Sequence, residues 1–174
     1  MNGELFKVVV TAIIVKDKRF LIAKRSDDEE KFPGLWTVPG GKLHIDDYAT
    51  GARDTSHYWY NALEKALARE VLEESGIEIT NIRYVTSLAD KPEGNPPAGG
   101  PSVVLSMMGD WLSGEPQIND EIVEFAWVNL EEAHKYELIE GIWEELEQAE
   151  KLLVGERTVW VKKGKVKSIK GKAR

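Results

Sequence analysis

The sequence predicts an α/β fold, and three observations lead to this class. Apolar, β-branched runs typical of buried strands recur along the chain, and two segments carry apolar residues at helical spacing. Strands and helices follow one another in mixed order, which favours helices packed on a sheet. The length of 174 residues, with 42% hydrophobic and 30% charged residues, suits one domain with a buried core. We therefore expect residues 1–174 to form a single α/β domain.

The first strands are expected within the first quarter of the chain. Lys7–Val15 is continuous and β-branched, as in a strand buried on both faces. Lys16–Lys18 is a turn, after which Arg19–Ala23 returns as the partner of a hairpin. A charged loop, Ser26–Lys31, follows. Phe32–Gly41 contains two Pro-Gly steps, which predict a loop or a short strand with sharp turns.

A long helix is expected in the middle of the chain. His57–Ser75 carries the apolar period of a helix, with capping residues at 54–56 before it and Gly76 at its end. The preceding segment, His44–Ser56, is polar and is expected to be irregular.

The second half predicts three more strands, and their ranges are Ile77–Ser87, Ser102–Leu112 and Ile122–Val128. Ala89–Pro101 is rich in proline and glycine and predicts a long loop of the kind that often serves function. Asn129 caps a short helix, with Glu132 placed for a capping box.

The chain is expected to close with a helix, a hairpin and a basic tail. Glu137–Leu153 is amphipathic and ends before Gly155. Thr158–Val161 and Val166–Ile169 predict a terminal hairpin, whose edge could pair two copies of the chain as a homodimer.

Composition excludes several classes of function. The net charge of −7 does not favour nucleic acid or an anionic membrane as a partner. The absence of cysteine excludes disulfides, thiolate metal sites and a cysteine nucleophile. No apolar run is long enough for a transmembrane helix, and no signal peptide is recognisable. We expect a cytoplasmic protein.

The predicted long helix carries acids on its inward face. Leu63, Ala66, Leu67 and Val71 share one stripe with Trp59, and Glu70 and Glu74 continue it, with Glu73 just beside it. Acids on a solvated face would lie opposite the apolar stripe. Crowded carboxylates at the edge of a core need a cation, and three oxygen donors from one helical turn suit magnesium. Arg69, four residues before Glu73, can pair with it and hold the cluster in place.

These residues resemble a known motif. Arg69–Ile77, R-E-V-L-E-E-S-G-I, resembles the core of the Nudix box. Gly40–Leu43, following Leu35–Pro39, resembles the usual entry into that box. Glu124–Ala133 is similar to the last core strand of the family and the helix after it. The resemblance covers roughly residues 5 to 153 and leaves 154–174 as the hairpin and basic tail.

The resemblance implies a Nudix-type α/β/α sandwich with a mixed sheet and a loop-helix-loop metal site. Glu70, Glu73 and Glu74 would bind Mg²⁺ or Mn²⁺, helped by a carbonyl near Gly40 or Gly41. The substrate would be a small nucleotide with a diphosphate linkage: a nucleoside triphosphate, ADP-ribose or a nucleotide sugar.

In the implied reaction, water attacks a phosphorus atom, and the metal polarises the phosphoryl oxygens. The general base varies within the family. Either a glutamate of the box or an acid on a late loop can serve, and here Glu121 is the first candidate for the late acid and Asp120 the second. A solvated loop residue is the plain alternative for Glu121.

The sequence departs from the family between the two halves of the box. The family places a glutamate shortly after the box glycine, and this chain instead carries an inserted segment, residues 44–61. The insertion is expected to bulge as a loop and to extend the long helix backwards through Tyr58–Tyr60. Asp46, Asp47, Glu64 or no residue at all could replace the missing glutamate.

Three further residues are candidates for substrate binding. Lys24 and Arg25 follow the strand Arg19–Ala23 and could meet phosphates, although a solvated strand end is equally consistent with the pattern. Trp36 could stack on a base, whereas packing is the commoner role of a tryptophan at this point.

Other functions on the same fold are weighed against hydrolysis. A non-hydrolytic nucleotide-sensing module usually loses the acids of the box, which this chain keeps. A diphosphate isomerase of the isopentenyl type would resemble a cysteine-dependent enzyme, and no cysteine is present. An mRNA-decapping role would bring a basic surface, which the net charge does not favour.

Overall fold

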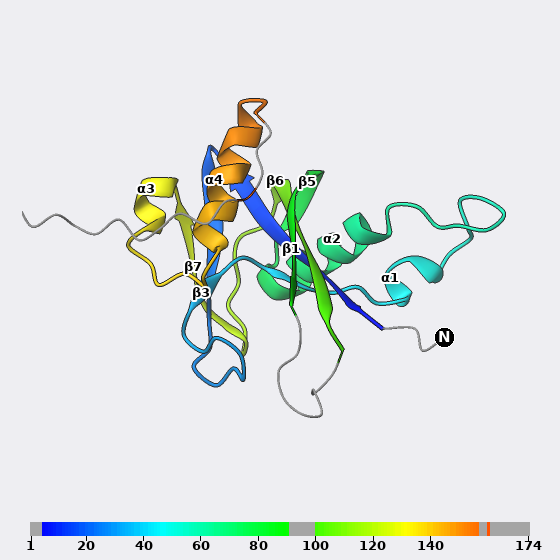
Figure 1. Ribbon diagram of the computed structural model, residues 1–174, viewed down its shortest axis with the longest axis horizontal. Helices are drawn as coiled ribbons and strands as arrows, with labels where there is room; N and C mark the ends of the chain where they lie inside the picture. The colour runs from blue at the N-terminus through cyan, green and yellow to red at the C-terminus, as the bar shows by residue number, and fades with distance from the viewer. Residues whose placement is uncertain (1–4, 91–99, 157–159, 161–174) are drawn as a thin grey trace, which may run out of the picture.

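The computed structural model describes residues 5–90, 100–156 and 160, and its architecture is a sheet between helices (Figure 1). The strands are β1 Lys7–Lys16, β2 Arg19–Arg25, β3 Trp36–Thr37, β4 Gly40–Lys42, β5 Glu78–Asp90, β6 Ser102–Ser113 and β7 Ile122–Val128. The helices are α1 Asp46–Ala49, α2 Ala62–Ser75, α3 Leu130–Ala133 and α4 Ile142–Leu153. Among the described residues, no helix is both long and apolar enough to cross a membrane.

The strands of the described part form one mixed sheet. Its order is β3-β2-β1-β6-β5, with β4 added to β1 and β7 added to β2. β1 runs parallel to β6, and the other pairings, including the hairpin of β1 and β2, are antiparallel. The predicted mixed sheet is therefore confirmed.

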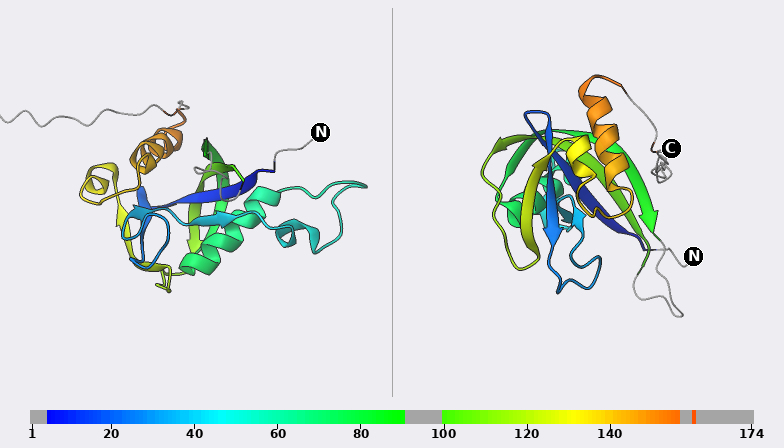
Figure 2. Two further views of the ribbon diagram at one scale, coloured as in Figure 1. Left: turned by 60° about the horizontal axis from the view of Figure 1, so that its bottom comes forward. Right: turned by 90° about the vertical axis from the view of Figure 1, so that its left-hand side faces the viewer.

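Two apolar clusters lie on the two faces of the sheet. Alternate residues of β1 enter them: Val10, Ala12 and Ile14 pack with α2, while Ile13 and Val15 pack on the side of α4. Figure 2 shows α2 and α4 on opposite sides of the sheet. A strand buried on both faces and an α/β/α sandwich, as predicted, are what the structure contains.

The long helix begins later than predicted, and the prediction of a helix over residues 57–61 is wrong. Asn61 adopts a left-handed conformation, with φ 56°, immediately before α2. Asp54 and Thr55 explain the break, because their side chains accept hydrogen bonds from the backbone N–H groups of residues 57, 58 and 60. Such local bonds compete with a helix and form a turn.

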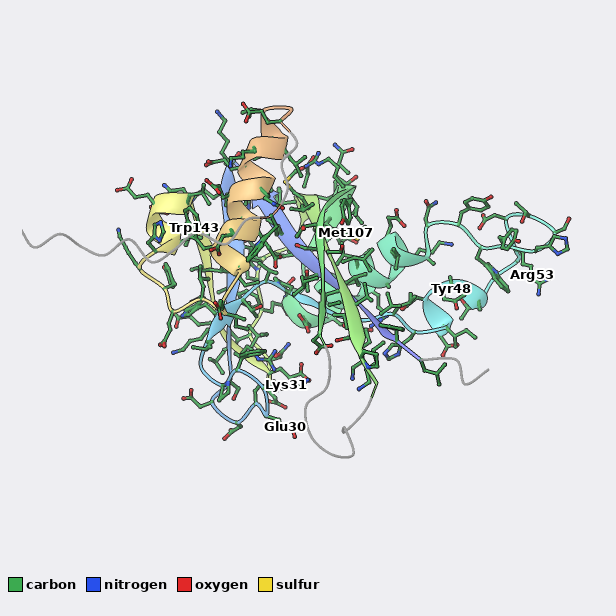
Figure 3. All side chains as sticks on the ribbon, viewed as in Figure 1. Glu30, Lys31, Tyr48, Arg53, Met107 and Trp143 are labelled. Atoms are coloured by element: carbon green, nitrogen blue, oxygen red, sulfur yellow. The ribbon has the colours of Figure 1, made fainter. Side chains whose placement is uncertain are left out.

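The inserted segment projects from the body of the molecule (Figures 1 and 3), where it contains the short helix α1. Its prediction as wholly irregular is thus corrected at residues 46–49. The predicted backward extension of α2 through residues 58–60 is also wrong. Trp59 is anchored within the segment, since its ring donates to the carbonyl of Gly51 and packs on Tyr48 and Arg53.

The last helix is also shorter than predicted. α4 begins at Ile142, after Gly141 with φ 100°, and not at Glu137. Residues 137–139 are extended instead and pair with Trp36. The N–H of Trp36 donates to the backbone carbonyl of Glu137, and the N–H of Ile139 donates to the backbone carbonyl of Trp36. The capping box of Asn129 and Glu132 is present as predicted. The predicted terminal hairpin lies outside the described residues, apart from Trp160.

Candidate functional site

The second half of α2 carries the acids of the site. Ala66, Leu67 and Val71 are fully buried against the sheet and fix the rotation of the helix. Glu70 and Glu74 continue that inward face and are partly buried, whereas the side chain of Glu73 is 61% exposed. Gly76, with φ 71°, ends the helix and donates to the carbonyl of Leu72. The apolar stripe predicted within α2 therefore does turn acidic at its end.

Gly41 leaves room for the carboxyl group of Glu70, and Gly40 leaves room for the backbone of β1. Both lie in β4, opposite Thr11 and Val10 of β1. A Cβ atom on Gly41 would lie 2.3 Å from the carboxyl group of Glu70, and one on Gly40 would lie 2.3 Å from the carbonyl oxygen of Val10. Gly40 N–H donates to the carboxylate of Glu74 at 2.9 Å. The structure thus brings together the two halves of the motif that are separated in the sequence.

Arg69 joins the acids to one another. Its guanidinium donates to Glu70 at 2.9 Å, to Glu73 at 2.8 Å and to the carbonyl of Lys42 at 3.1 Å. It also forms two hydrogen bonds to Asp47 in α1. The expected pair of Arg69 and Glu73 is therefore only one part of a larger network.

Asp47 is the acid of the inserted segment that reaches this network. Its side chain is only 2% exposed and also accepts from the backbone N–H of His44 at 2.7 Å. The hydrogen bond from Arg69 is the main cause that lowers the pKa of Asp47. Of the acids considered as replacements for the missing glutamate, Asp47 is the one that the structure joins to Arg69.

Glu74 has the strongest electrostatic conflict in the site. Burial raises the pKa of Glu74 to about 7, although the hydrogen bond from Gly40 favours its charged form. The negative charges of Glu70 and Glu121 raise the pKa further, while Arg25 opposes them. Glu121 is thus close enough for its charge to act on Glu74.

A short loop positions Glu121. The side chain of Asn119 donates to the carbonyl of Glu74 at 3.2 Å and accepts from the N–H groups of Glu121 and Ile122. Ser26 N–H donates to the carbonyl of Glu121 at 2.7 Å. The loop before β7 is therefore tied both to the end of α2 and to the end of β2. The sequence did not single out Asn119, and the only available signal was an asparagine two residues before the candidate acid.

The three predicted substrate-binding residues occupy different places. On β2, Leu21 faces the cluster beneath α2, whereas Phe20 and Ile22 face the opposite cluster. Alternation places Arg25 with Leu21 and Lys24 with Ile22. The charge of Arg25 acts on Glu74, in agreement with this placement. Trp36 is 7% exposed, with its ring packed edge-on against Tyr136, so its side chain serves the core.

A cleft lined by charges of both signs lies next to Lys42 of β4 and Arg25 of β2. It has a volume of about 590 Å³, and four of its lining residues are Lys7, Arg25, Lys31 and Lys42. Three acids, Glu29, Glu30 and Asp90, also line the cleft, and Glu29 pairs with Arg25. Sequence reasoning missed the three lysines, although the position of Lys42 directly after the glycine pair was a usable signal.

The arrangement of donors can be tested against a divalent cation. No three acidic or histidine side chains in the described ranges form a ready set of ligands. Arg69 holds Glu73 and one oxygen of Glu70, and Gly40 holds Glu74. The donor set nevertheless fits a hard cation. The carboxyl group of Glu70 occupies the space that a Cβ atom on Gly41 would fill, and Glu74 accepts from Gly40 beside it. Burial is the main cause of the raised pKa of Glu74, and the charges of Glu70 and Glu121, which a cation would offset, add to it.

Comparison with known proteins agrees with this geometry. A family model described as the NUDIX domain matches residues 5–152. The nucleoside triphosphatase NudI of Escherichia coli is 30% identical over 140 residues, covering 75% of this chain and 86% of that protein.

Solved structures share the fold. A MutT NUDIX hydrolase from Burkholderia pseudomallei has 26% identity and a TM-score of 0.61, over 83% of this chain and 98% of that one. The E. coli ORF135 protein has 28% identity and a TM-score of 0.60, over 89% of this chain and 96% of that one. With a family match that spans most of its length, the chain belongs to the Nudix hydrolases.

Proposed function

We propose that this protein hydrolyses a diphosphate bond of a nucleoside triphosphate, with the help of a divalent metal ion. One observation carries the proposal: the partly buried Glu74 accepts a hydrogen bond from Gly40 of β4, and the charges of Glu70 and Glu121 act on it. The name of the E. coli relative, a nucleoside triphosphatase, supports a triphosphate over ADP-ribose or a nucleotide sugar.

The residues divide into three tasks in this proposal. Glu70, Glu73 and Glu74 would hold Mg²⁺ or Mn²⁺, with the backbone of Gly40 or Gly41 beside them. When bound, the metal would polarise phosphoryl oxygens and acidify the attacking water. Arg69 and Asp47 would orient the acids. The cleft would bind the phosphates through Lys7, Arg25, Lys31 and Lys42, which outnumber the three acids of its lining.

Glu121 is our candidate for the general base. Its loop is tied to α2 and β2, and its charge acts on Glu74. An ionised carboxylate near the acids of α2 can accept a proton from water. Asp120, the neighbouring residue, is the second candidate.

The proposal is tested by turnover. The protein with magnesium is incubated with nucleoside triphosphates, ADP-ribose, nucleotide sugars and dinucleoside polyphosphates, and phosphate and pyrophosphate release is followed. We expect turnover of at least one triphosphate and its loss after chelation of the metal. Reaction in ¹⁸O-labelled water identifies the phosphorus that is attacked.

A matched pair of variants locates the chemistry. Glu74→Gln is expected to lower kcat/KM about a hundredfold or more, because the charge stabilisation that a bound metal supplies is worth several kcal/mol, whereas Glu64→Gln, on the same helix, leaves it within a few-fold. Nucleotide binding with unchanged affinity in the absence of metal, together with no turnover of any panel member, would instead identify a nucleotide-sensing module.

A further inference from the structure

A second buried glutamate lies on the other face of the sheet. α4 turns Glu145 and Gln148 toward the strands, where they are only 5% and 4% exposed. Ser106 of β6, fully buried, donates its hydroxyl to the carboxylate of Glu145 at 2.7 Å. Among the described residues, no lysine, arginine or histidine forms an ion pair with Glu145, and the charge of Glu144 acts on it unfavourably. A buried carboxylate with so little compensation is costly for the fold.

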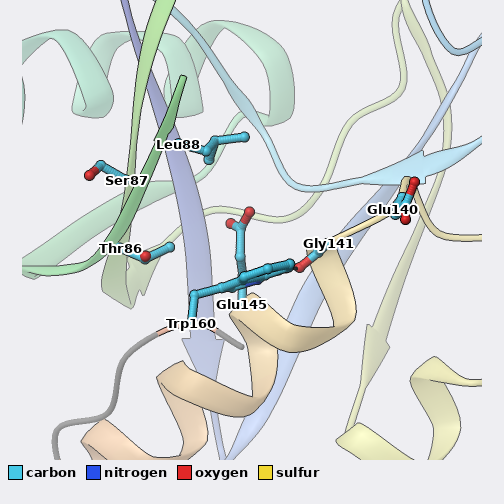
Figure 4. A pocket seen from close by; sticks show the side chains of 7 residues that line it. All are labelled: Thr86, Ser87, Leu88, Glu140, Gly141, Glu145 and Trp160. Carbon is cyan, nitrogen blue, oxygen red and sulfur yellow. Dashed lines mark hydrogen bonds between the residues drawn. The ribbon is translucent and has the colours of Figure 1, made fainter. Parts of the chain in front are cut away.

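Glu145 faces a cavity. The cavity, of about 460 Å³, is bounded by Thr86–Leu88 of β5 on one side and by Glu140, Gly141 and Glu145 on the other, with Trp160 beside them. Figure 4 shows the carboxylate of Glu145 directed from α4 toward Leu88, with the indole of Trp160 alongside. The volume is large enough for a small organic molecule.

Gly141 helps to hold Trp160 in place at the wall of this cavity. Gly141 has φ 100°, a conformation that favours glycine, and its carbonyl accepts from the indole N–H at 3.4 Å. A Cβ atom on Gly141 would come 3.7 Å from the ring. The backbone turn before α4 therefore holds the indole beside the cavity that Glu145 faces.

The lining determines which charge a ligand can carry. The described residues of the lining supply two carboxylates, an indole, a leucine and two hydroxyls, and no basic side chain is among them. An anion would be repelled, and a neutral molecule would leave the charge of Glu145 without a counterion. An organic cation with an apolar or flat body suits both the carboxylate and the apolar wall of the cavity. Its ammonium group would pair with Glu145, and its body would pack against Trp160 and Leu88.

We propose that this cavity binds an organic amine, with its ammonium group on Glu145 and its apolar body against Trp160 and Leu88. The site is separate from the acids of α2, since Ser106 and Glu145 lie on the face of the sheet that α4 covers. The proposal does not depend on the hydrolase activity.

Three ligands of similar shape but different charge test whether the cavity prefers a cation. Benzylamine, benzyl alcohol and benzoate are titrated into the full-length, metal-free protein, and heat and tryptophan fluorescence are recorded. We expect benzylamine to bind at least tenfold more tightly than the alcohol, and benzoate not to bind. Equal affinity for the amine and the alcohol, or no binding of the amine, overturns the proposal.

Variants locate the site. Glu145→Gln keeps the shape of the side chain and can still accept from Ser106, and we expect it to weaken benzylamine at least tenfold. Glu150→Gln, exposed on the same helix, should leave the affinity unchanged. Trp160→Leu should weaken the amine several-fold and remove the fluorescence change. Unaltered affinity in Glu145→Gln overturns the assignment.

A final probe separates this site from the substrate site. Guanosine, a neutral nucleoside, is titrated under the same conditions. Tight binding of guanosine that is lost in Glu145→Gln would make the cavity part of the nucleotide site and would overturn the separate amine site. We expect instead weak binding that the substitution does not change, and a rate of hydrolysis within a few-fold of the wild type in Glu145→Gln.

Discussion

Two helices each turn one glutamate toward the sheet, on opposite faces, and the two glutamates have different surroundings. Glu74 is partly buried and Glu145 is buried. Glu74 of α2 meets a backbone N–H group and faces two other acids. Glu145 of α4 meets one hydroxyl and an open cavity walled by an indole. Burial raises the pKa of both carboxyl groups. Several converging acids suit a small multivalent cation, whereas a single acid beside apolar surface suits an organic one.

The support around the two glutamates differs as well. Arg69 connects Asp47, Glu70 and Glu73 into a network beside Glu74. No arginine in the described residues forms an ion pair with Glu145. Substitutions beside α2 should therefore affect hydrolysis and leave benzylamine binding unchanged, and each variant below is measured by both assays.

After Glu74→Gln, the largest effect on the rate is expected from Gly41→Ala. Its new Cβ atom would lie 2.3 Å from the carboxyl group of Glu70, so the helix or the carboxylate must move. A displacement of about 1 Å in a catalytic group can cost about a hundredfold in rate, and we expect kcat/KM to fall by that order. Steady-state kinetics and circular dichroism separate this effect from unfolding. Gly51→Ala, with nothing within 4 Å of its Cβ, is the control. Equal activity of the two variants would refute the inference that Gly41 must lack a side chain for Glu70 to take its position.

Asp47→Asn removes the acid that the inserted segment gives to Arg69. Asparagine keeps one acceptor but loses the charge, so Arg69 can turn further toward Glu70 and Glu73. Loss of such supporting partners typically costs roughly 10–100-fold in activity or metal affinity, and we expect this range. Asp46→Asn serves as the neighbouring control.

The conservative variant decides whether Asp47 acts through Arg69. Asp47→Glu should recover part of the activity, because it restores the ionic partner. A weaker affinity for magnesium in Asp47→Asn, measured by calorimetry, is the readout that simple destabilisation would not produce. Activity at the wild-type level in Asp47→Asn would show that the inserted segment does not support the acids.

The pH dependence of stability provides a third comparison. In the folded, metal-free protein, Glu74 keeps its proton up to a pKa of about 7, compared with 4.5 for an ordinary glutamate. Between these values the folded state binds more protons than the unfolded state, so the free energy of unfolding falls as the pH rises. The difference corresponds to roughly 3 kcal/mol at most.

Denaturation at pH 5 and pH 8 in the presence of a chelator measures this slope. We expect Glu74→Gln to flatten it and magnesium at pH 8 to stabilise the wild type more than the variant. Burial of Glu145 acts in the same direction, but magnesium should not offset it. An identical slope in Glu74→Gln would exclude Glu74 as its source.

Much of the site on α2 could be predicted because its signal is local. Glu70 and Glu74 continue the stripe of Ala66, Leu67 and Val71, and that periodicity survives folding. The start of α2 could not be predicted from periodicity. The side chains of Asp54 and Thr55 accept hydrogen bonds from the backbone of residues 58 and 60, and the helix begins only after Asn61. The pairing of Arg69 with Asp47 depends on how the inserted segment folds back onto α2, and the sequence of that segment has no periodicity that would predict this.

The site on α4 was missed for a related reason. Glu145 lies next to Leu146 on a helix whose buried residues include Ile142 and Ala149, and a single acid at such a position does not alter the apolar period. Its hydroxyl partner, Ser106, comes from a strand that is distant in the sequence. The tryptophan of its wall follows the helix, and only the fold brings the three side chains together (Figure 4).

The smallest effect is expected from Asn119→Ala, which releases the loop of Glu121. The variant loses the bond to the carbonyl of Glu74 and the acceptor for the N–H groups of Glu121 and Ile122. Lost hydrogen bonds of this kind cost about 1 kcal/mol each, so the protein should remain folded. If Glu121 is the general base, kcat should fall several-fold while KM changes little. Gln117→Ala, on the same loop, is the control, and a change in KM alone would assign the loop to substrate binding.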